Sequence, residues 1–314
     1  FSDSTNGALL LEGQSTNLIP YSSDLTSWTK IVSSVTYLEN VINPSGETFA
    51  SKITQTSSGG YVQLSRTFTG VETFSAFVKK SSSDFVRFYA GGNSVYFNIL
   101  NGTIETISGS VEDKSITDFG NGWFRISITV NSTSSSSVRI YPASSGSSTS
   151  GLNSLFVYGT QLEVGSYATS YIPSLSGSTT TRLADACNNS GSAQDFNSES
   201  GVLYAEIAAL ADDLTNRKIS ISNGSSTQRI LLSYSTISNA LVFQVVNSTL
   251  QVNLSYILTD IKLLTKVAVK WKLNDFSFWV NGVEVAIDSS GLTPIGLTEL
   301  SFDRGFAGEN FYGK

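Results

Sequence analysis

The residues that could bind a ligand lie on one alternating face of the predicted strands. The stretches 84–90, 94–100 and 123–130 alternate an apolar set, typical of a core, with a set that mixes aromatic and hydrogen-bonding side chains. Such mixtures bind sugars, because aromatic rings stack on their C–H faces while guanidinium and amide groups bond their hydroxyls. We expect a concave, glycan-binding sheet face formed by Arg87, Tyr89, Tyr96, Asn98 and Arg125. An ordinary strand surface is the alternative.

The residue combinations that hydrolytic enzymes use are missing. The chain has no histidine, which removes the usual general base and the Ser-His-Asp triad. It has no G-x-S-x-G motif and no E-x-D-x-E acid pair of the glucanase type. The nearest acid pairs, Glu284 with Asp288 and Asp212 with Asp213, have the pattern of surface residues. The sequence therefore predicts a protein that is not an enzyme.

Metal and cofactor motifs are also missing. No spacing typical of a zinc site, a P-loop or an EF-hand occurs. We expect no cofactor, although a structural calcium ion held by loop carbonyls and scattered acids stays open. The single cysteine, Cys187, excludes an intrachain disulfide and is expected to be a free thiol in a polar linker.

Charge and composition narrow the possible partners. The net charge is −6, with 19 Lys and Arg against 25 Asp and Glu, so we expect no binding to nucleic acid. No apolar run approaches the 18 residues of a membrane span, so we expect no insertion into a membrane. Only 14% of the residues are charged. Ser, Thr, Asn and Gly fill the surface instead, which is typical of extracellular β-proteins.

Period-two alternation indicates an all-β chain. Short strands rich in Val, Ile, Phe and Tyr recur along the sequence, separated by turn signals such as Asn101-Gly102 and Asn281-Gly282. Only 210–216 and 257–264 look helical, and both are short. The pattern predicts two tandem antiparallel β-sandwiches, or jelly rolls, with little helix.

Composition places the domain boundary in a polar stretch. We expect a first domain over 1–178, a linker over 179–200, and a second domain over 201–314. Leu9–Leu11 is expected to form the first strand of domain one, beside the last strand around 162–165, which repeats its Leu-Glu-x-Gly pattern. Glu12 and Glu163 would then be structural, anchoring loop amides or a cation.

Five stretches of the first half resemble a known family. They are "LLLEGQSTNLIPYSSDLTSWTK" (9–30), "NPSGETFASKIT" (43–54), "FGNGWFRISIT" (119–129), "YGTQLEVGSYATSYIPS" (158–174) and "TTTRLADA" (179–186). In order and spacing they resemble the carbohydrate-binding-like jelly roll of bacteriophage tail, fibre and adhesin proteins. Family members often have Arg where Ser15 stands, so no role of that Arg is carried over.

The second half resembles the concanavalin A-like, or laminin-G-like, sandwich that follows in the same proteins. The resemblance lies in 201–210, in "VAVKWKLNDFSFWVNGVEVAID" (267–288) and in "LSFDRGFAGENFYGK" (300–314). Family members usually add one more strand beyond this point. Here that closing strand is missing, supplied by another chain, or not covered. The family's ligand residues are poorly fixed, so none is carried over.

The resemblance implies a non-enzymatic phage virion protein, a tail fibre, adhesin or head fibre, that binds host cell-surface glycans. Such fibres are usually homotrimers or other homo-oligomers, and the other partners would be virion proteins. Two alternatives stay open. The chain could be a purely structural virion decoration or spacer, or the non-catalytic carbohydrate-binding part of a secreted polysaccharide-degrading enzyme.

Overall fold

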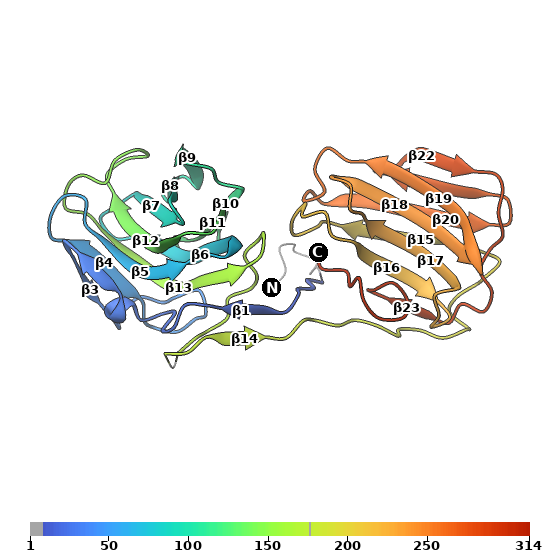
Figure 1. The fold of residues 1–314 in the computed structure, drawn as a ribbon, viewed down its shortest axis with the longest axis horizontal. Coiled ribbons are helices and arrows are strands. Elements are labelled where there is room, and N and C mark those ends of the chain that lie inside the picture. Colours follow the sequence, from blue (N-terminus) through green and yellow to red (C-terminus); the bar gives the residue numbers. More distant parts are fainter. Residues whose placement is uncertain (1–8, 176) are drawn as a thin grey trace. The chain divides into compact units, whose positions relative to one another are not determined.

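The computed structural model describes residues 9–175 and 177–314. The chain divides into two compact units (Figure 1). One is Gln14–Leu183, here called the N-terminal sandwich. The other, the C-terminal sandwich, combines Ala184–Lys314 with the described residues that precede Gln14. Every strand pairing in both units is antiparallel, so the predicted all-β class is confirmed.

Two six-stranded sheets form the N-terminal sandwich. The first, called the β12 sheet, has the order β2 (Thr29–Ile31), β5 (Tyr61–Thr67), β12 (Ser135–Ala143), β7 (Phe85–Ala90), β8 (Asn93–Asn98) and β9 (Thr103–Ser108). The second, called the β6 sheet, has the order β10 (Asp113–Asp118), β11 (Trp123–Ser132), β6 (Gly70–Lys80), β13 (Ser154–Val164), β4 (Ser51–Gln55) and β3 (Ser33–Thr36). A two-stranded pair, β1 (Ser15–Asn17) with β14 (Thr180–Arg182), and a 3₁₀ turn, η1 (Leu25–Ser27), complete this unit.

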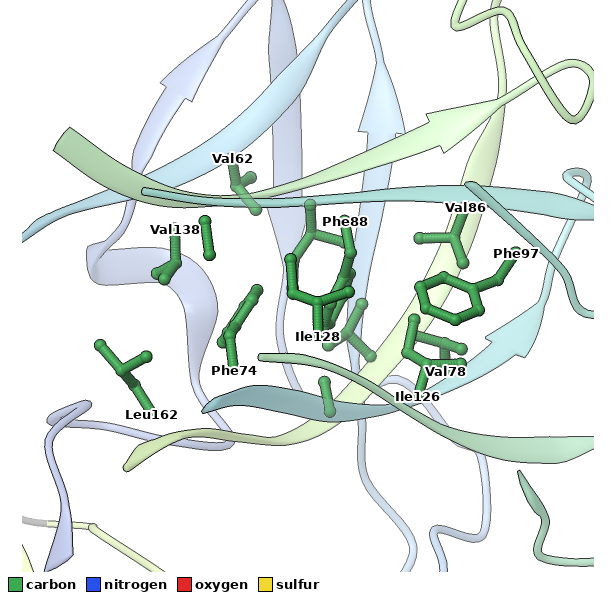
Figure 2. Close-up of a cluster of buried hydrophobic side chains, with 14 of the residues drawn as sticks. Val62, Phe74, Val78, Val86, Phe88, Phe97, Ile126, Ile128, Val138 and Leu162 are labelled. Atoms are coloured by element: carbon green, nitrogen blue, oxygen red, sulfur yellow. The ribbon is translucent and has the colours of Figure 1, made fainter. Parts of the chain in front are cut away.

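Alternation along the strands sends one set of side chains between these two sheets (Figure 2). Phe74 of β6 stacks on Phe88 of β7 with ring centroids 4.4 Å apart and an interplanar angle of 14°. Each fully buried Phe contributes about 2–3 kcal/mol to stability. The other sides of the same strands face outward, and one of them carries the candidate site.

The C-terminal sandwich has a four-stranded and a five-stranded sheet. The first has the order β15 (Ser200–Ile207), β20 (Thr265–Lys272), β21 (Phe276–Val280) and β22 (Val283–Asp288). The second has the order β19 (Thr249–Ile257), β18 (Ala240–Asn247), β17 (Gln228–Tyr234), β16 (Arg217–Ser222) and β23 (Glu299–Ser301). Trp271 lies buried in its core, whereas Trp279 is 38% exposed.

The start of the described chain belongs to the C-terminal sandwich, and not to the jelly roll as expected. Leu11 is buried in that core and exchanges two backbone hydrogen bonds of 3.0 Å with Gly313. Gly313 also bridges Ala209. Leu9–Leu11 therefore does not open domain one. That sandwich instead begins with β1, whose following residue Leu18 donates to Leu162 of β13.

The expected linker over 179–200 is also divided between the two units. Residues 180–182 form β14 in the N-terminal sandwich. Ser190 exchanges backbone hydrogen bonds of 3.0 and 2.7 Å with Leu300, and Cys187 packs partly buried against the C-terminal core. This stretch is polar because it runs along β23, the edge strand of the five-stranded sheet, and makes many side-chain hydrogen bonds.

The two expected helices do not form. Residues 210–216 are irregular, and residues 257–264 continue from the end of β19 into turns. Both stretches are shorter than the length at which a helix is stable without packing support. The expected Asn281-Gly282 hairpin joins β21 to β22 with φ of 49° and 84°, as a type I′ turn requires. The hairpin at Asn101-Gly102 also forms, but only Gly102 has a positive φ.

Glu163 has the structural role that the sequence predicts. Its carboxylate is buried and accepts hydrogen bonds from Ser15 Oγ at 2.6 Å, Gln161 Nε2 at 2.6 Å, Thr169 Oγ1 at 2.5 Å and Thr169 N at 3.1 Å. A buried carboxylate needs such donors to offset its lost hydration. Glu163 therefore ties β1 and the loop at 169 to the last long strand of the sandwich.

Candidate functional site

The outward side of the β12 sheet carries a cluster of tyrosines and arginines. Their strand neighbours Val62, Ile140, Phe88 and Phe97 point into the core, so alternation directs the cluster away from it. We call this cluster the tyrosine–arginine face. It consists of Tyr61 of β5, Arg139 and Tyr141 of β12, Arg87 and Tyr89 of β7, and Tyr96 of β8.

Strand register places these six residues side by side. Tyr141 lies opposite Arg87, and Arg87 lies opposite Tyr96. Arg139 lies opposite Tyr89 in the next row of the same strand pair. Cross-strand partners have Cβ atoms about 4.5–5.5 Å apart, so rings and guanidinium groups on this face are in reach of one another.

The two guanidinium groups are held between tyrosine rings. The Arg87 guanidinium carbon lies 5.6 Å from the Tyr96 ring centroid and 4.9 Å from that of Tyr141. For Arg139 the corresponding distances are 5.1 Å to Tyr61 and 4.4 Å to Tyr89. The rings of Tyr61 and Tyr141 are 4.4 Å apart. Stacking restricts both arginines and so lowers the entropy that a ligand contact would cost.

Several donors on this face are left without a partner among the described residues. Arg87 donates through Nε to Ser94 Oγ at 3.2 Å, and its terminal nitrogens donate to no protein atom of the described chain. Arg139 is more fully used, because Nε donates to Ser137 Oγ at 2.7 Å and Nη1 to Tyr141 Oη at 3.2 Å. The hydroxyl of Tyr96 has no hydrogen-bond partner in the described part of the chain and is accessible to solvent.

The electrostatics of the face are positive. Strands β5, β12, β7 and β8 contain no Asp or Glu. Glu105, in the edge strand β9, accepts a hydrogen bond from Thr103 Oγ1 at 2.9 Å. Burial raises the pKa of Tyr141, although Arg139 and Arg87 lower it in part, so this phenol is neutral at physiological pH.

Four of the five residues expected in the glycan site lie on this side of the β12 sheet, and Arg125 does not. Arg87, Tyr89 and Tyr96 share the tyrosine–arginine face. Asn98 ends β8, where its Oδ1 accepts from the backbone amides of Leu100 and Asn101 at 3.0 and 3.1 Å. Its side-chain oxygen is therefore already occupied in a turn at the end of the face.

Arg125 does not belong to this face. It lies on β11 in the β6 sheet, where its Nη2 donates to the carbonyl of Thr169 and its guanidinium stacks 5.3 Å from the Phe77 ring. Alternation gives the side of a strand to which a residue points, but it does not give the sheet to which the strand belongs. The expectation that Arg125 joins Arg87 is therefore wrong.

Sequence reasoning left Tyr61, Arg139 and Tyr141 out of the site. Arg139 and Tyr141 alternate with the core residues Val138 and Ile140, which is a signal that they share an outward face. Tyr61 begins β5, where Val62 is the buried residue. The alternation of buried and exposed residues along β5 is weaker than along β12. Only the pairing of β12 with both β5 and β7 shows that all three residues join Arg87.

A hollow lies beside the end of β6 in the N-terminal sandwich. It is an open hollow of about 560 Å³ beside β6 and the turn at 120–122. Lys79 reaches across it, donating to the Asn121 carbonyl at 2.6 Å. The residues that line it are Lys79, Lys80, Ser81, Ile99, Leu100, Asp118, Gly120, Asn121, Gly122 and Phe124.

Within residues 9–175 and 177–314, no three His, Cys, Asp or Glu side chains come together in a group that could hold a metal ion. The described chain also has no helix with the length and apolar character of a membrane span.

Comparisons with known proteins found matches among solved structures and none among family models or curated sequences. Among solved structures, domains LG4-5 of the mouse laminin alpha1 chain match with 10% identity and a TM-score of 0.28, covering 100% of this chain and 90% of that one. The LG1-3 region of the laminin alpha2 chain matches with 11% identity and a TM-score of 0.20, covering 78% of this chain and 57% of that one. The β-sandwich class of this chain rests on its own strand pairing.

Proposed function

We propose that the chain is a non-catalytic, glycan-binding protein of a bacteriophage virion, a tail fibre, adhesin or head fibre, and that the tyrosine–arginine face is its ligand site. The observation that carries the binding role is this face, where tyrosine rings alternate with guanidinium groups and the terminal nitrogens of Arg87 donate to no atom of the described residues. The virion role rests on the sequence resemblance of residues 8–186 to phage jelly rolls.

Weak binding at such a face is sufficient when it is repeated. Linked copies raise avidity by increasing the effective concentration of neighbouring sites, without any new contact. A homotrimer or another homo-oligomer in a virion supplies those copies. The virion that carries these copies is an extracellular particle, and binding of this kind needs no catalytic group.

A purely structural decoration or spacer protein is the second candidate. The observation that favours it is the stacking of the rings and guanidinium groups on one another. Such contacts stabilise the sheet without any ligand. The two candidates predict different behaviour of the isolated chain towards sugars.

Binding of the full chain to a glycan array and to host cells separates these candidates. The Tyr89→Ala variant removes one stacking ring and is expected to weaken binding about tenfold or more. The matched control is Lys52→Ala, which removes a cation–π contact outside the tyrosine–arginine face. The Lys52 Nζ lies 5.6 Å from the centroid of the Phe156 ring, and both residues belong to the β6 sheet of the same unit. Equal loss in both variants, or no binding by the native chain, would contradict the proposal. Cryo-electron microscopy of the source particle tests the virion location and symmetry.

A further inference from the structure

The tyrosine–arginine face is a basic surface on an acidic protein. The whole chain has a net charge of −6, yet the four central strands β5, β12, β7 and β8 contain arginines and no acidic residue. Of these, Arg66 pairs with the buried Glu72 at 3.3 Å. Arg87 and Arg139 have no carboxylate partner among the described residues. Two uncompensated cations therefore lie on adjacent strands of one face.

The hydrogen-bonding chemistry of these cations restricts the ligand. A guanidinium group only donates, whereas each hydroxyl of a neutral sugar also needs an acceptor for its own proton. Sites for neutral sugars commonly supply that acceptor as a carboxylate or an amide. The central strands of this face supply no carboxylate. Their two outward amides do not serve Arg87, because Gln63 lies opposite Arg139 and the Oδ1 of Asn98 already accepts two backbone amides. The ligand group that matches a planar, donor-only fork is an acceptor-only anion such as a carboxylate or a sulfate.

We propose that the tyrosine–arginine face binds an acidic glycan, in which Arg87 holds the carboxylate or sulfate group of a sugar residue and the partly exposed rings of Tyr61 and Tyr89 stack on the sugar. This inference rests on the proposed function and adds the chemical class of its ligand. Arg87 has this role because Nε is its one bonded nitrogen, held by Ser94. The rings of Tyr96 and Tyr141 fix the plane of its guanidinium group.

Arg139 has a positioning role. Its bonds to Ser137 and Tyr141 and its stacking on Tyr61 and Tyr89 keep three rings of the face in place. It also adds positive potential close to Arg87, because the two residues are diagonal neighbours on adjacent strands, about 7–8 Å apart. The second charge therefore strengthens attraction to a polyanion without contacting the same acidic group.

Matched pairs of polysaccharides test the inference with the full chain. Polygalacturonate is compared with its methyl ester, and dextran sulfate with dextran, by biolayer interferometry at 50 and 300 mM NaCl. We expect binding to at least one acidic polymer, at least tenfold weaker binding to its neutral counterpart, and weakening at the higher salt concentration. The first pair reports a carboxylate ligand and the second a sulfate ligand.

Variants assign the effect to Arg87. Arg87→Gln is expected to weaken acidic-polymer binding about 10- to 100-fold, because it removes a charge-assisted, two-pronged contact. Arg87→Lys, which keeps the charge and loses the fork, should be intermediate. Lys52→Gln changes the net charge equally and should bind like the native chain. Thermal unfolding of each variant checks that the fold is intact.

The outcomes separate the two proposals. Equal binding to acidic and neutral polymers, reduced by Tyr89→Ala and unchanged by Arg87→Gln, would overturn the acidic ligand and keep glycan binding. Equal losses in Arg87→Gln and Lys52→Gln would also overturn it, because general charge would then explain the attraction. No binding to any of the four polymers, together with a negative glycan array, would overturn both proposals.

Discussion

Tyr171 is a partly buried phenol that is held in its neutral form. Its hydroxyl lies 2.6 Å from Ser22 Oγ and 2.8 Å from Ser23 Oγ, and burial raises its pKa to about 12. Tyr234, in the other core, also has a raised pKa because of burial, and its hydroxyl has no hydrogen-bond partner among the described residues. In both cases the folded state disfavours the phenolate.

The raised pKa of Tyr171 makes stability depend on alkaline pH. The unfolded chain loses this proton near pH 10 and the folded chain near pH 12, so the contribution is complete below pH 10 and is lost between pH 10 and pH 12. We expect the free energy of unfolding to fall by about 2–3 kcal/mol from this group across that window. Urea unfolding at pH 9, 10 and 11 should show a shallower fall in Tyr171→Phe. Parallel pH slopes for the variant and the native chain would contradict this account.

At the scale of elements, local pairing was predictable and sheet membership was not. Arg87, Tyr89 and Tyr96 lie on adjacent strands joined by a short turn, so alternation alone brings them to one face. Arg125 alternates equally well, but β11 pairs with β6 and β10 in the opposite sheet. Tyr141 joins the face because β12 inserts between β5 and β7, a pairing of strands far apart in sequence. Such long-range choices depend on the packing of the whole core.

The close approach between the end of β2 and the start of β5 depends on Gly60, the residue before Tyr61. A Cβ built on Gly60 would lie 2.1 Å from the Val32 carbonyl oxygen. That oxygen already accepts the amides of Thr56 and Ser57 at 2.9 and 3.4 Å, so it cannot move freely. We expect Gly60→Ala to lower the free energy of unfolding by about 1–3 kcal/mol, as overpacking does elsewhere.

Gly59→Ala is the neighbouring control for this prediction. Gly59 has a φ of 78° and no atom within 4 Å of its built Cβ, so it tests backbone strain without a clash. Its cost should be about 1 kcal/mol. Urea unfolding measures both losses. A smaller loss of stability in Gly60→Ala than in Gly59→Ala would contradict the prediction, because it would show that the Val32 carbonyl moves aside at little cost.

At the scale of the molecule, the N-terminal sandwich is inserted into the C-terminal one along the chain. Composition indicated one polar boundary, and the structure has two crossing points, at Gly13 and at Ala184. Composition does not mark the first passage between the units, because the apolar residues Leu9–Leu11 are compatible with a buried strand in either unit. Its membership is decided by backbone pairing with Gly313, 302 residues away in sequence, which no local pattern reveals.

This insertion predicts how the C-terminal sandwich behaves when it is cut out. A fragment of residues 184–314 loses Leu11 from its core and the backbone partner of Gly313. Residues 12 and 185 are joined by two hydrogen bonds of 2.9 Å, so a short Gly-Ser linker can replace residues 14–183. We expect the linked chain to be about 2–5 kcal/mol more stable than the fragment, the cost of losing a buried leucine. Leu11→Ala in the linked chain should remove most of that gain. Equal urea midpoints for the fragment and the linked chain would mean that the segment with Leu11 adds nothing to this core.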